Sequence, residues 1–394
     1  MKSYDTIVIG AGIMGTLIAY ELSKAGQKVL VLEKKDTGMG TGGATGGIVS
    51  WFTKQPGYHR ELFMESWRLF DELEEEIGDI GLDRHKGFMQ LIENDMELEL
   101  VKKGLENMQV PAGYSLSLLN RREMLELEPN VGPEIIGALF TPDSGHVHSF
   151  KYIYAALEAA KRMGAEIRNE TGVSSLLRTD SRIMGVETDK GERIYGDTVV
   201  NCAGVWGARI AKMAGIEMPI RPRRGQIVAL EACDPFVHRP ITNSMYQVIK
   251  FHPELVTDEL VKRLGYTFAI EQSEEGTIML NNTREFAGFD TGVTQEAIQC
   301  IVQGAVKHFP GLKGMSIIRA FAGLRPYTPD GLPIIGRIDG LDGFLMAAGH
   351  EGDGIALSPI TAAIVRDLLI CGQAKVDIAK LSPMRFLGEE AGKI

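Results

Sequence analysis

The hydrophobic positions near the start of the chain predict a strand, a helix and a second strand. Residues 4–9 (YDTIVI) form a short apolar run, which suits a strand buried on both faces of a parallel sheet. Apolar residues then recur at helical spacing from Leu17 to Leu22, and Gly26 is expected to end this helix. Residues 28–33 (KVLVLE) supply the next strand. The pattern is typical of a strand–helix–strand unit with parallel strands.

Helical and strand patterns alternate along the rest of the chain. Apolar residues spaced three and four apart predict helices over 59–77 and 150–163. Short apolar segments separated by turn residues predict strands, of which the first three form a small meander and the fourth returns to the parallel sheet: 173–178, 183–188, 192–195 and 197–202. Further strand patterns (GQIVALE, GTIMLN) lie between 224 and 286, and a last strand (GFLMAA) precedes an apolar helix that ends near 370. The chain is therefore expected to cross between two domains several times.

Length and composition agree with a large globular protein. A chain of 394 residues exceeds what one hydrophobic core usually holds, so at least two domains are expected. The net charge of −10, without any run of lysine and arginine, argues against a nucleic-acid partner. Its four cysteines are scattered without a C-x-x-C motif, which favours reduced thiols. Asp5 interrupts the start of any signal peptide and no stretch is apolar enough to cross a bilayer, so a cytoplasmic location is predicted.

A glycine-rich turn joins the first predicted strand to the first helix. In Gly10-Ala11-Gly12-Ile13-Met14-Gly15, the first glycine permits a tight turn, the second lets the backbone approach a pyrophosphate, and the third lets the helix pack closely on the strand. Glu33 ends the second strand, where a carboxylate can accept hydrogen bonds from ribose hydroxyls. This combination predicts an adenine dinucleotide site but does not distinguish FAD from NAD.

Residues 38–47 (GMGTGGATGG) follow the second strand and are too rich in glycine for an ordinary loop. With this loop, the chain resembles the flavin-dependent amine and amino-acid oxidoreductases, the family of D-amino-acid oxidase, glycine oxidase and sarcosine oxidase. Five motifs in order carry the resemblance: VIGAGIMG, VLEK, VVNCAGVWG at 199–207, GLRPYTPDGLPIIG at 323–336 and AGHEGDGIALSP at 348–359. Four segments (TKQPG, RRGQ, TREFAGFD, GHEGDGIALSP) are most similar to the catalytic beta subunits of bacterial proline, hydroxyproline and sarcosine dehydrogenases.

The resemblance implies an α/β fold in which a Rossmann-like FAD-binding domain (GR2-type) is interleaved with an α+β substrate domain built on a mixed or antiparallel sheet. The expected FAD-binding domain comprises 1–86, 145–218 and 320–394, and the substrate domain comprises 87–144 and 219–319. FAD is expected to be bound noncovalently, with its ADP half at the first glycine turn and its isoalloxazine ring at the C-terminal one. The residues expected to contact FAD are Gly10, Gly12, Ile13, Met14, Gly15, Glu33, Lys34, Gly42, Gly43, Ala44, Thr45, Gly46, Gly47, Val173, Cys202, Ala203, Gly204, Trp206, Arg325, Gly349, His350, Glu351, Gly352, Asp353, Gly354 and Ile355.

The same resemblance identifies candidate substrate-binding residues. Arg325 stands where related oxidases bind the substrate carboxylate, and its planar guanidinium suits that group; a salt bridge to Asp330 is the alternative. His350 is predicted to contact substrate or flavin, or else to be a hydrogen-bonded structural histidine. Tyr246 and Gln272 are candidates for the roof of the substrate pocket.

Other polar residues favour structural roles. Arg223 and Arg224 suit an ion-paired domain junction. His146 and His148 would share one strand face, but no third metal ligand is identified, so no metal site is predicted.

The favoured function is FAD-dependent oxidation of a small amino acid, preferentially a secondary amine such as proline, hydroxyproline or sarcosine, to the imine. The resemblance to dehydrogenase subunits implies that electrons pass to a partner subunit or carrier. The alternatives are a free-standing oxidase that releases hydrogen peroxide, a noncatalytic flavoprotein subunit, and a nicotinamide dehydrogenase, and a 2-hydroxy acid substrate also stays open.

Overall fold

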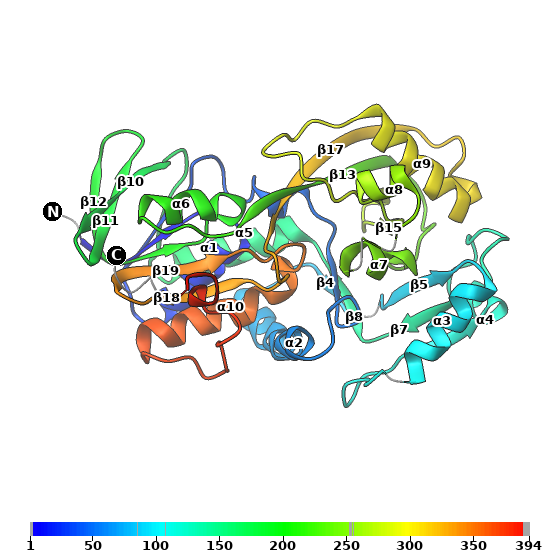
Figure 1. Ribbon diagram of the computed structural model, residues 1–394, viewed down its shortest axis with the longest axis horizontal. Helices are drawn as coiled ribbons and strands as arrows, with labels where there is room; N and C mark the ends of the chain where they lie inside the picture. The colour runs from blue at the N-terminus through cyan, green and yellow to red at the C-terminus, as the bar shows by residue number, and fades with distance from the viewer. Residues whose placement is uncertain (1–2, 85, 107, 252–253, 255, 389–394) are drawn as a thin grey trace.

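A computed structural model describes residues 3–84, 86–106, 108–251, 254 and 256–388, and it contains two large sheets (Figure 1). The first, sheet A, has the strand order β10-β11-β19-β12-β1-β2-β9, with β18 paired to β19. Its central strands β19, β12, β1, β2 and β9 are parallel. The strand bounds are β1 (Ser3–Ile9), β2 (Val29–Leu32), β9 (Glu166–Arg168), β10 (Val173–Thr179), β11 (Arg182–Thr188), β12 (Arg193–Asn201), β18 (Ile334–Ile338) and β19 (Leu341–Ala348).

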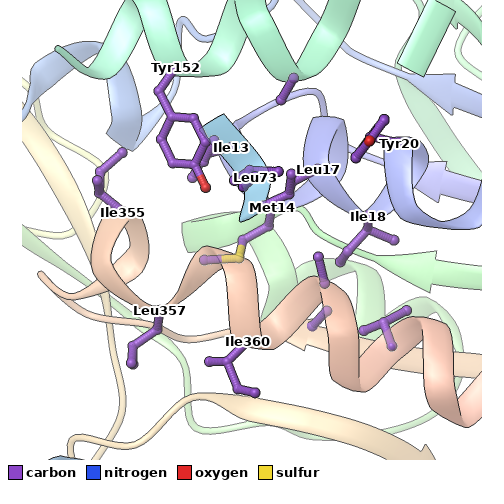
Figure 2. Close-up of a cluster of buried hydrophobic side chains, with 14 of the residues drawn as sticks. Ile13, Met14, Leu17, Ile18, Tyr20, Leu73, Tyr152, Ile355, Leu357 and Ile360 are labelled. Carbon is purple, nitrogen blue, oxygen red and sulfur yellow. The ribbon is translucent and has the colours of Figure 1, made fainter. Parts of the chain in front are cut away.

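Sheet A is covered on both faces, which explains the uninterrupted apolar runs of its strands. In β1, Val8 packs into one core cluster, while Ile7 and Ile9 pack into another on the opposite face. On the Val8 face, four helices pack against one another: α1 (Ile13–Lys24), α2 (Tyr58–Ile77), α5 (Ser149–Arg162) and α10 (Gly354–Ile370). Figure 2 shows side chains of all four helices meeting in this core. The helices expected over 59–77 and 150–163 are thereby confirmed.

The second sheet, sheet C, is mixed, which is one of the two predicted alternatives, mixed or antiparallel. Its order is β17-β13-β16-β15-β14-β5-β7-β6, and every pairing is antiparallel except that of β14 with β5. The strands are β5 (Phe88–Ile92), β6 (Ser117–Asn120), β7 (Gly137–Thr141), β13 (Arg221–Ala232), β14 (Ile241–Asn243), β15 (Ala269–Gln272), β16 (Thr277–Asn281) and β17 (Ile317–Tyr327). In Figure 1, the long strands β13 and β17 run from this sheet toward sheet A.

The remaining described elements are short. A three-stranded sheet contains β3 (Ile48–Ser50), β4 (Leu82–Asp83) and β8 (Ser144–Val147). The other α-helices are α3 (Asp95–Glu106), α4 (Arg121–Leu127), α6 (Gly207–Met213), α7 (Met245–Phe251), α8 (Glu259–Leu264) and α9 (Gln295–His308). Four 3-10 turns are η1 (Thr41–Ala44), η2 (Gly204–Trp206), η4 (Pro310–Leu312) and η5 (Pro383–Phe386). Among the described residues, no helix has the length and apolar character needed to span a membrane.

Two details differ from the predicted elements. The segments 192–195 and 197–202 were expected to be separate, but β12 runs without a break through Gly196. This glycine is needed for packing, because a Cβ there would lie 2.9 Å from Cγ1 of Ile7. In addition, the domain boundary predicted at 320 falls inside β17, whose pairing with β13 places the whole strand in sheet C.

Candidate active site

A cavity of about 470 Å³ lies where the glycine turns of sheet A meet the edge of sheet C. Most residues predicted to contact FAD line it, although they come from seven separate segments of the chain. These lining residues are Gly10, Gly12, Ile13, Met14, Glu33, Lys34, Gly42, Ala44, Thr45, Gly46, Val173, Cys202, Ala203, Gly204, Trp206, Arg325, His350, Glu351, Gly352, Asp353, Gly354 and Ile355. Further lining residues include Tyr246 on helix α7, and Asn282 and Arg284 in the segment that follows strand β16.

Four of the predicted FAD contacts lie behind the cavity wall instead. Gly15 packs helix α1 onto the turn, since a Cβ there would lie 1.8 Å from the carbonyl oxygen of Gly10. Gly43, Gly47 and Gly349 face Gly38, Val147 and Thr328 respectively, and none of the three lines the cavity. These glycines shape the wall, and their direct contact with FAD stays a prediction.

The cavity offers what an extended dinucleotide requires. Helix α1 begins there without a side-chain cap and without an acidic residue in its first turn. Helix α10 begins at the same cavity, also without a side-chain cap hydrogen bond or a first-turn acid. Both helices therefore present free backbone N–H groups and the positive end of a dipole. The first suits a pyrophosphate, and the second suits the electron-rich edge of a flavin ring.

Glu33 holds the turn that would receive the ADP half. Its carboxylate accepts hydrogen bonds from the backbone N–H of Ala11 at 2.9 Å and of Lys35 at 2.8 Å. A carboxylate has about four acceptor positions, so these two bonds leave capacity for ribose hydroxyls. Glu33 lines the cavity, and the residues present fit the predicted role.

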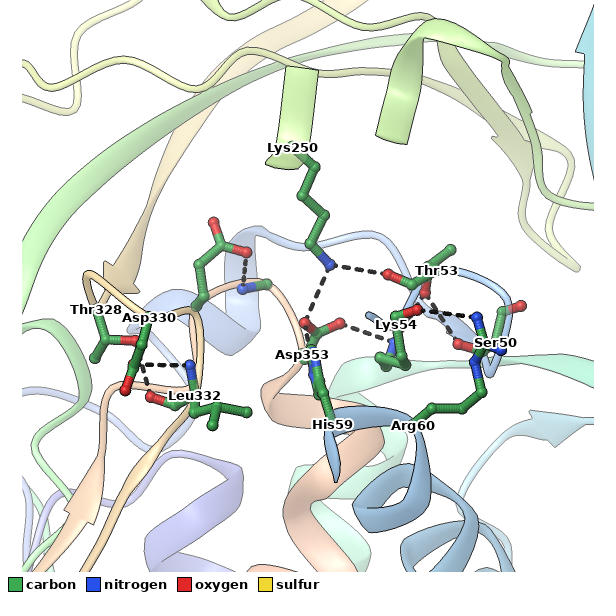
Figure 3. A network of polar contacts seen from close by, with 12 residues as sticks. Ser50, Thr53, Lys54, His59, Arg60, Lys250, Thr328, Asp330, Leu332 and Asp353 are labelled. Carbon is green, nitrogen blue, oxygen red and sulfur yellow. Dashed lines mark hydrogen bonds and ion pairs between the residues drawn. The ribbon is translucent and has the colours of Figure 1, made fainter. Parts of the chain in front are cut away.

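Asp353, at the start of α10, joins three parts of the chain (Figure 3). Its two oxygens lie 2.8 Å from Nζ of Lys54 and 3.1 Å from Nζ of Lys250, and His59 Nε2 lies 3.5 Å away. Burial alone would raise the pKa of Asp353, but Lys250 and Lys54 outweigh it, and the pKa lies well below its usual range. The site therefore contains a permanently ionised carboxylate between two buried lysines. In the sequence, Lys54 stands in the TKQPG segment, whereas no motif pointed to Lys250.

Glu351 makes the second buried ion pair of the site. It pairs with the guanidinium of Arg223 on β13, and its backbone N–H donates to the carbonyl of Pro326 at 3.0 Å. Burial opposes ionisation, but Arg223 and Arg325 lower the pKa of Glu351 to about 2. The neighbouring Arg224 pairs with Glu285 and Asp290. Both arginines are therefore ion-paired, and of these pairs only Arg223–Glu351 joins the two predicted domains.

Arg325 reaches the cavity from β17. Its Nη1 donates to the carbonyl of Thr283 and its Nη2 to Oδ1 of Asn282, both at 2.9 Å. Gly225 makes room for it, since a Cβ there would lie 2.3 Å from Nη1. Burial, together with nearby Arg284 and Arg223, lowers the pKa of Arg325 to about 10, so it stays charged at neutral pH.

Within the described ranges, no carboxylate forms a salt bridge with Arg325. The alternative pairing with Asp330 is not formed, because Asp330 binds Arg385 at 2.7 Å. The Arg325 guanidinium therefore keeps unused N–H donors for an anion in the cavity.

Two further predicted catalytic residues, Tyr246 and Gln272, lie in different surroundings. Tyr246 lines the cavity, and the Arg284 guanidinium carbon lies 4.8 Å from the centre of its ring. Burial would raise the pKa of Tyr246, but Lys250 and Arg284 outweigh it and lower the pKa below its usual value. Gln272 is not among the residues that line the cavity, and its place in the roof of the substrate pocket stays a prediction. Its amide is used fully in holding the loop at 233–237, where it accepts from the N–H groups of Phe236 and Val237 and donates to Cys233 and Gly276.

Each histidine singled out in the sequence has a polar neighbour in the structure. His350 lines the cavity, and its Nε2 lies 3.0 Å from Oγ1 of Thr361 on α10. His148 caps α5, and His146 lies 3.3 Å from the buried Glu271. The described residues contain no group of three or more potential metal ligands. Cys202 is buried, which raises the pKa of its thiol and suits a structural role.

Acid is expected to destabilise the protein through its buried histidines. Burial lowers the pKa of His350 to about 3 and that of His59 to about 4, from 6.5 in each case. Below pH 6.5 the unfolded chain binds protons that the folded chain does not, so stability is full above pH 6.5 and falls toward pH 4. Each such histidine contributes at most about 1.4 kcal/mol per pH unit to the fall in the free energy of unfolding.

The His350→Gln variant should therefore lose less stability than the parent between pH 7 and pH 5. Urea unfolding midpoints at both values measure this difference. An unchanged slope would show that His350 does not stay neutral in the folded protein.

Comparison with known proteins agrees with this geometry. The chain matches the family DAO, described as FAD dependent oxidoreductase, over residues 5–368. It is 29% identical over 436 residues to the hydrogen cyanide synthase subunit HcnC of Pseudomonas aeruginosa, covering 99% of this chain and 98% of that protein. The glycine oxidase of Bacillus licheniformis is 30% identical over 383 residues, 95% of each chain. The crystal structure of L-proline dehydrogenase from P. horikoshii has a TM-score of 0.85 at 27% identity, covering 98% of each chain.

Proposed function

The chain belongs to the DAO family of FAD-dependent oxidoreductases, and from this premise we propose that it oxidises a small amino acid, preferentially a secondary amine such as proline, hydroxyproline or sarcosine, to the imine. The observation that carries the proposal is the Arg325 guanidinium, which lines the cavity without a carboxylate salt bridge among the described residues. Its free donors can hold the substrate carboxylate at the same cavity where helix α10 begins.

FAD, when bound, supplies the electron acceptor for the hydride that leaves the carbon next to nitrogen. Arg325 would fix one end of the substrate, and orientation of this kind contributes much of the rate in reactions that need little acid–base machinery. Tyr246 lies in the same cavity and would contact the substrate beside Arg325. The cations Lys54, Arg284 and Arg325 would lower the pKa of the substrate ammonium and favour the neutral amine that the oxidation requires.

The electron acceptor is proposed to be a partner subunit or carrier. The HcnC relative is named as a subunit of a larger enzyme, and the structural neighbour from P. horikoshii is named a dehydrogenase. A free-standing oxidase is the second candidate, because the relative from Bacillus licheniformis is named glycine oxidase. A cytoplasmic location remains part of the proposal.

The proposal is tested by mixing the purified yellow protein anaerobically with proline, hydroxyproline, sarcosine, glycine and a 2-hydroxy acid. We expect a secondary amino acid to bleach the flavin fastest. Reduction of an added dye without peroxide formation in air would support the dehydrogenase, and stoichiometric peroxide would support the oxidase. A flavin that no amino acid bleaches would overturn the proposal and favour a noncatalytic subunit.

A further inference from the structure

We propose that the substrate carries a second carboxylate and that Arg284 binds it, so that the preferred substrate is an amino dicarboxylic acid. This inference rests on the proposed function, since it concerns the same cavity and assigns the first carboxylate to Arg325. It is carried by the charge balance of the cavity and by the unused donors of Arg284.

The first observation is an excess of positive charge. Five cationic side chains surround the end of the cavity at α10 and influence one another electrostatically: Lys54, Lys250, Arg223, Arg284 and Arg325. Only two carboxylates, Glu351 and Asp353, stand among them. Glu271, another buried carboxylate, faces His146 instead. Buried charge without a counter-ion is costly, so this cluster favours an anionic ligand.

The two carboxylates are already paired, and neither forms a salt bridge with Arg284. Asp353 lies between Lys54 and Lys250, while Glu351 binds Arg223. Arg223 and Arg224 are as deeply buried as Arg284, and each has its own carboxylate. Arg284 and Arg325 instead donate hydrogen bonds to neutral oxygens, Arg284 to Thr267, and Arg325 to Thr283 and Asn282. One substrate carboxylate on Arg325 would leave the second guanidinium without an anion.

The second observation is the state of the Arg284 side chain. It is nine-tenths buried yet lines the cavity, so its residual exposure is toward the ligand space. Its Nη1 donates to Oγ1 of Thr267 at 3.0 Å, while its Nε is enclosed by protein without a hydrogen-bond partner within the described structure, so the guanidinium can meet a ligand only through its Nη groups. The guanidinium packs over the ring of Tyr246, which fixes its plane. A planar carboxylate has two oxygens that match these donors.

The test compares two inert ligands that differ by one carboxylate. Thiodiacetate and (methylthio)acetate contain sulfur in place of the amine, and their binding to the FAD-loaded protein is followed through the flavin absorption spectrum. We expect thiodiacetate to bind at least about tenfold more tightly, as a charge-assisted hydrogen bond in a buried site implies. In Arg284→Gln this advantage should disappear, while the matched control Arg263→Gln, at an exposed ion pair, should keep it.

Equal binding of the two ligands by the parent protein would overturn the inference. So would an Arg284→Gln variant that keeps the preference, or one that loses both ligands equally. If Arg284→Gln does not fold, as judged by its flavin content, Arg284→Lys is tested instead. This variant should retain part of the preference for thiodiacetate, because the charge remains while the planar donor pair is lost.

Turnover separates this inference from the proposed function. Iminodiacetate and sarcosine form the corresponding reactive pair, and we expect iminodiacetate to bleach the flavin at the lower concentration. If neither amine is oxidised while thiodiacetate still binds preferentially, the proposed function fails and the anion site stands. If sarcosine is oxidised at least as efficiently as iminodiacetate and the inert ligands bind equally, the second carboxylate is wrong and the proposed function stands.

Discussion

Replacing Arg325 with lysine is expected to raise the apparent KM for the amino-acid substrate by about two orders of magnitude while FAD stays bound. A lysine ammonium is a single point charge and cannot reproduce the planar pair of donors that the guanidinium presents. The charge remains in the lysine variant, so the loss is that of a hydrogen bond to a charged group, up to about 3 kcal/mol, which corresponds to the expected change.

Steady-state kinetics with a dye acceptor, together with the flavin content of the purified variant, measure this effect. Arg319→Lys is the matched control, because Arg319 lies on the same strand β17 but is exposed to solvent. The control should retain the parent KM. A near-normal KM in Arg325→Lys would remove Arg325 from the substrate site, whereas loss of FAD would show a role in cofactor binding instead.

Replacing Gly15 with alanine is expected to yield protein that purifies without flavin and unfolds at a lower temperature. The added Cβ would lie 1.8 Å from the carbonyl oxygen of Gly10, so helix α1 must move away from the turn. This Cβ would also lie 2.9 Å from the carbonyl carbon of Gly10. Both of these atoms belong to the backbone, which cannot move aside as a flexible side chain can. Overpacking of this kind costs about 1 to 3 kcal/mol and occasionally more. Because α1 also positions the free N–H groups at the cavity, we expect FAD affinity to fall by at least about a hundredfold.

Flavin absorbance per protein and thermal unfolding with added FAD measure this prediction. Gly104→Ala is the matched control, since Gly104 lies in helix α3 and no atom stands within 4 Å of an added Cβ. Alanine there should leave flavin content unchanged and stabilise the helix by up to about 1 kcal/mol. Normal flavin content in Gly15→Ala would show that α1 does not depend on this close approach.

Local patterns predicted the helices and strands well where one face or both faces are uniformly buried. The helical stripe of α2 and the apolar runs of β1 and β2 are signals of this kind, because burial repeats at the period of the element itself. The break predicted within β12 was wrong because Gly196 signals a turn in the sequence, whereas the structure requires a glycine to pack against Ile7. A residue type alone cannot distinguish these two reasons for a glycine.

The residues of the site were predictable to different degrees. The glycine turns and Arg325 stand in short motifs, and most of them line one cavity. Gln272 was harder to assign, because an amide serves equally well in a pocket or beneath a loop, and in the structure its side chain binds the loop at 233–237. Lys54, Lys250 and Arg284 carry no motif that assigns them to one cluster, because three separate segments bring them there.

The amino-acid sequence by itself determined the family, the dinucleotide cofactor and the two glycine turns, because each depends on residues adjacent in the chain. The tertiary structure alone decided which charges are paired and which face the cavity. Asp353 is neutralised by Lys54 and Lys250, while Arg284 lines the cavity beside Tyr246 and donates to neutral Thr267. Such pairing depends on distances of a few ångströms between distant segments, and Coulomb energies in a buried site change steeply over that range.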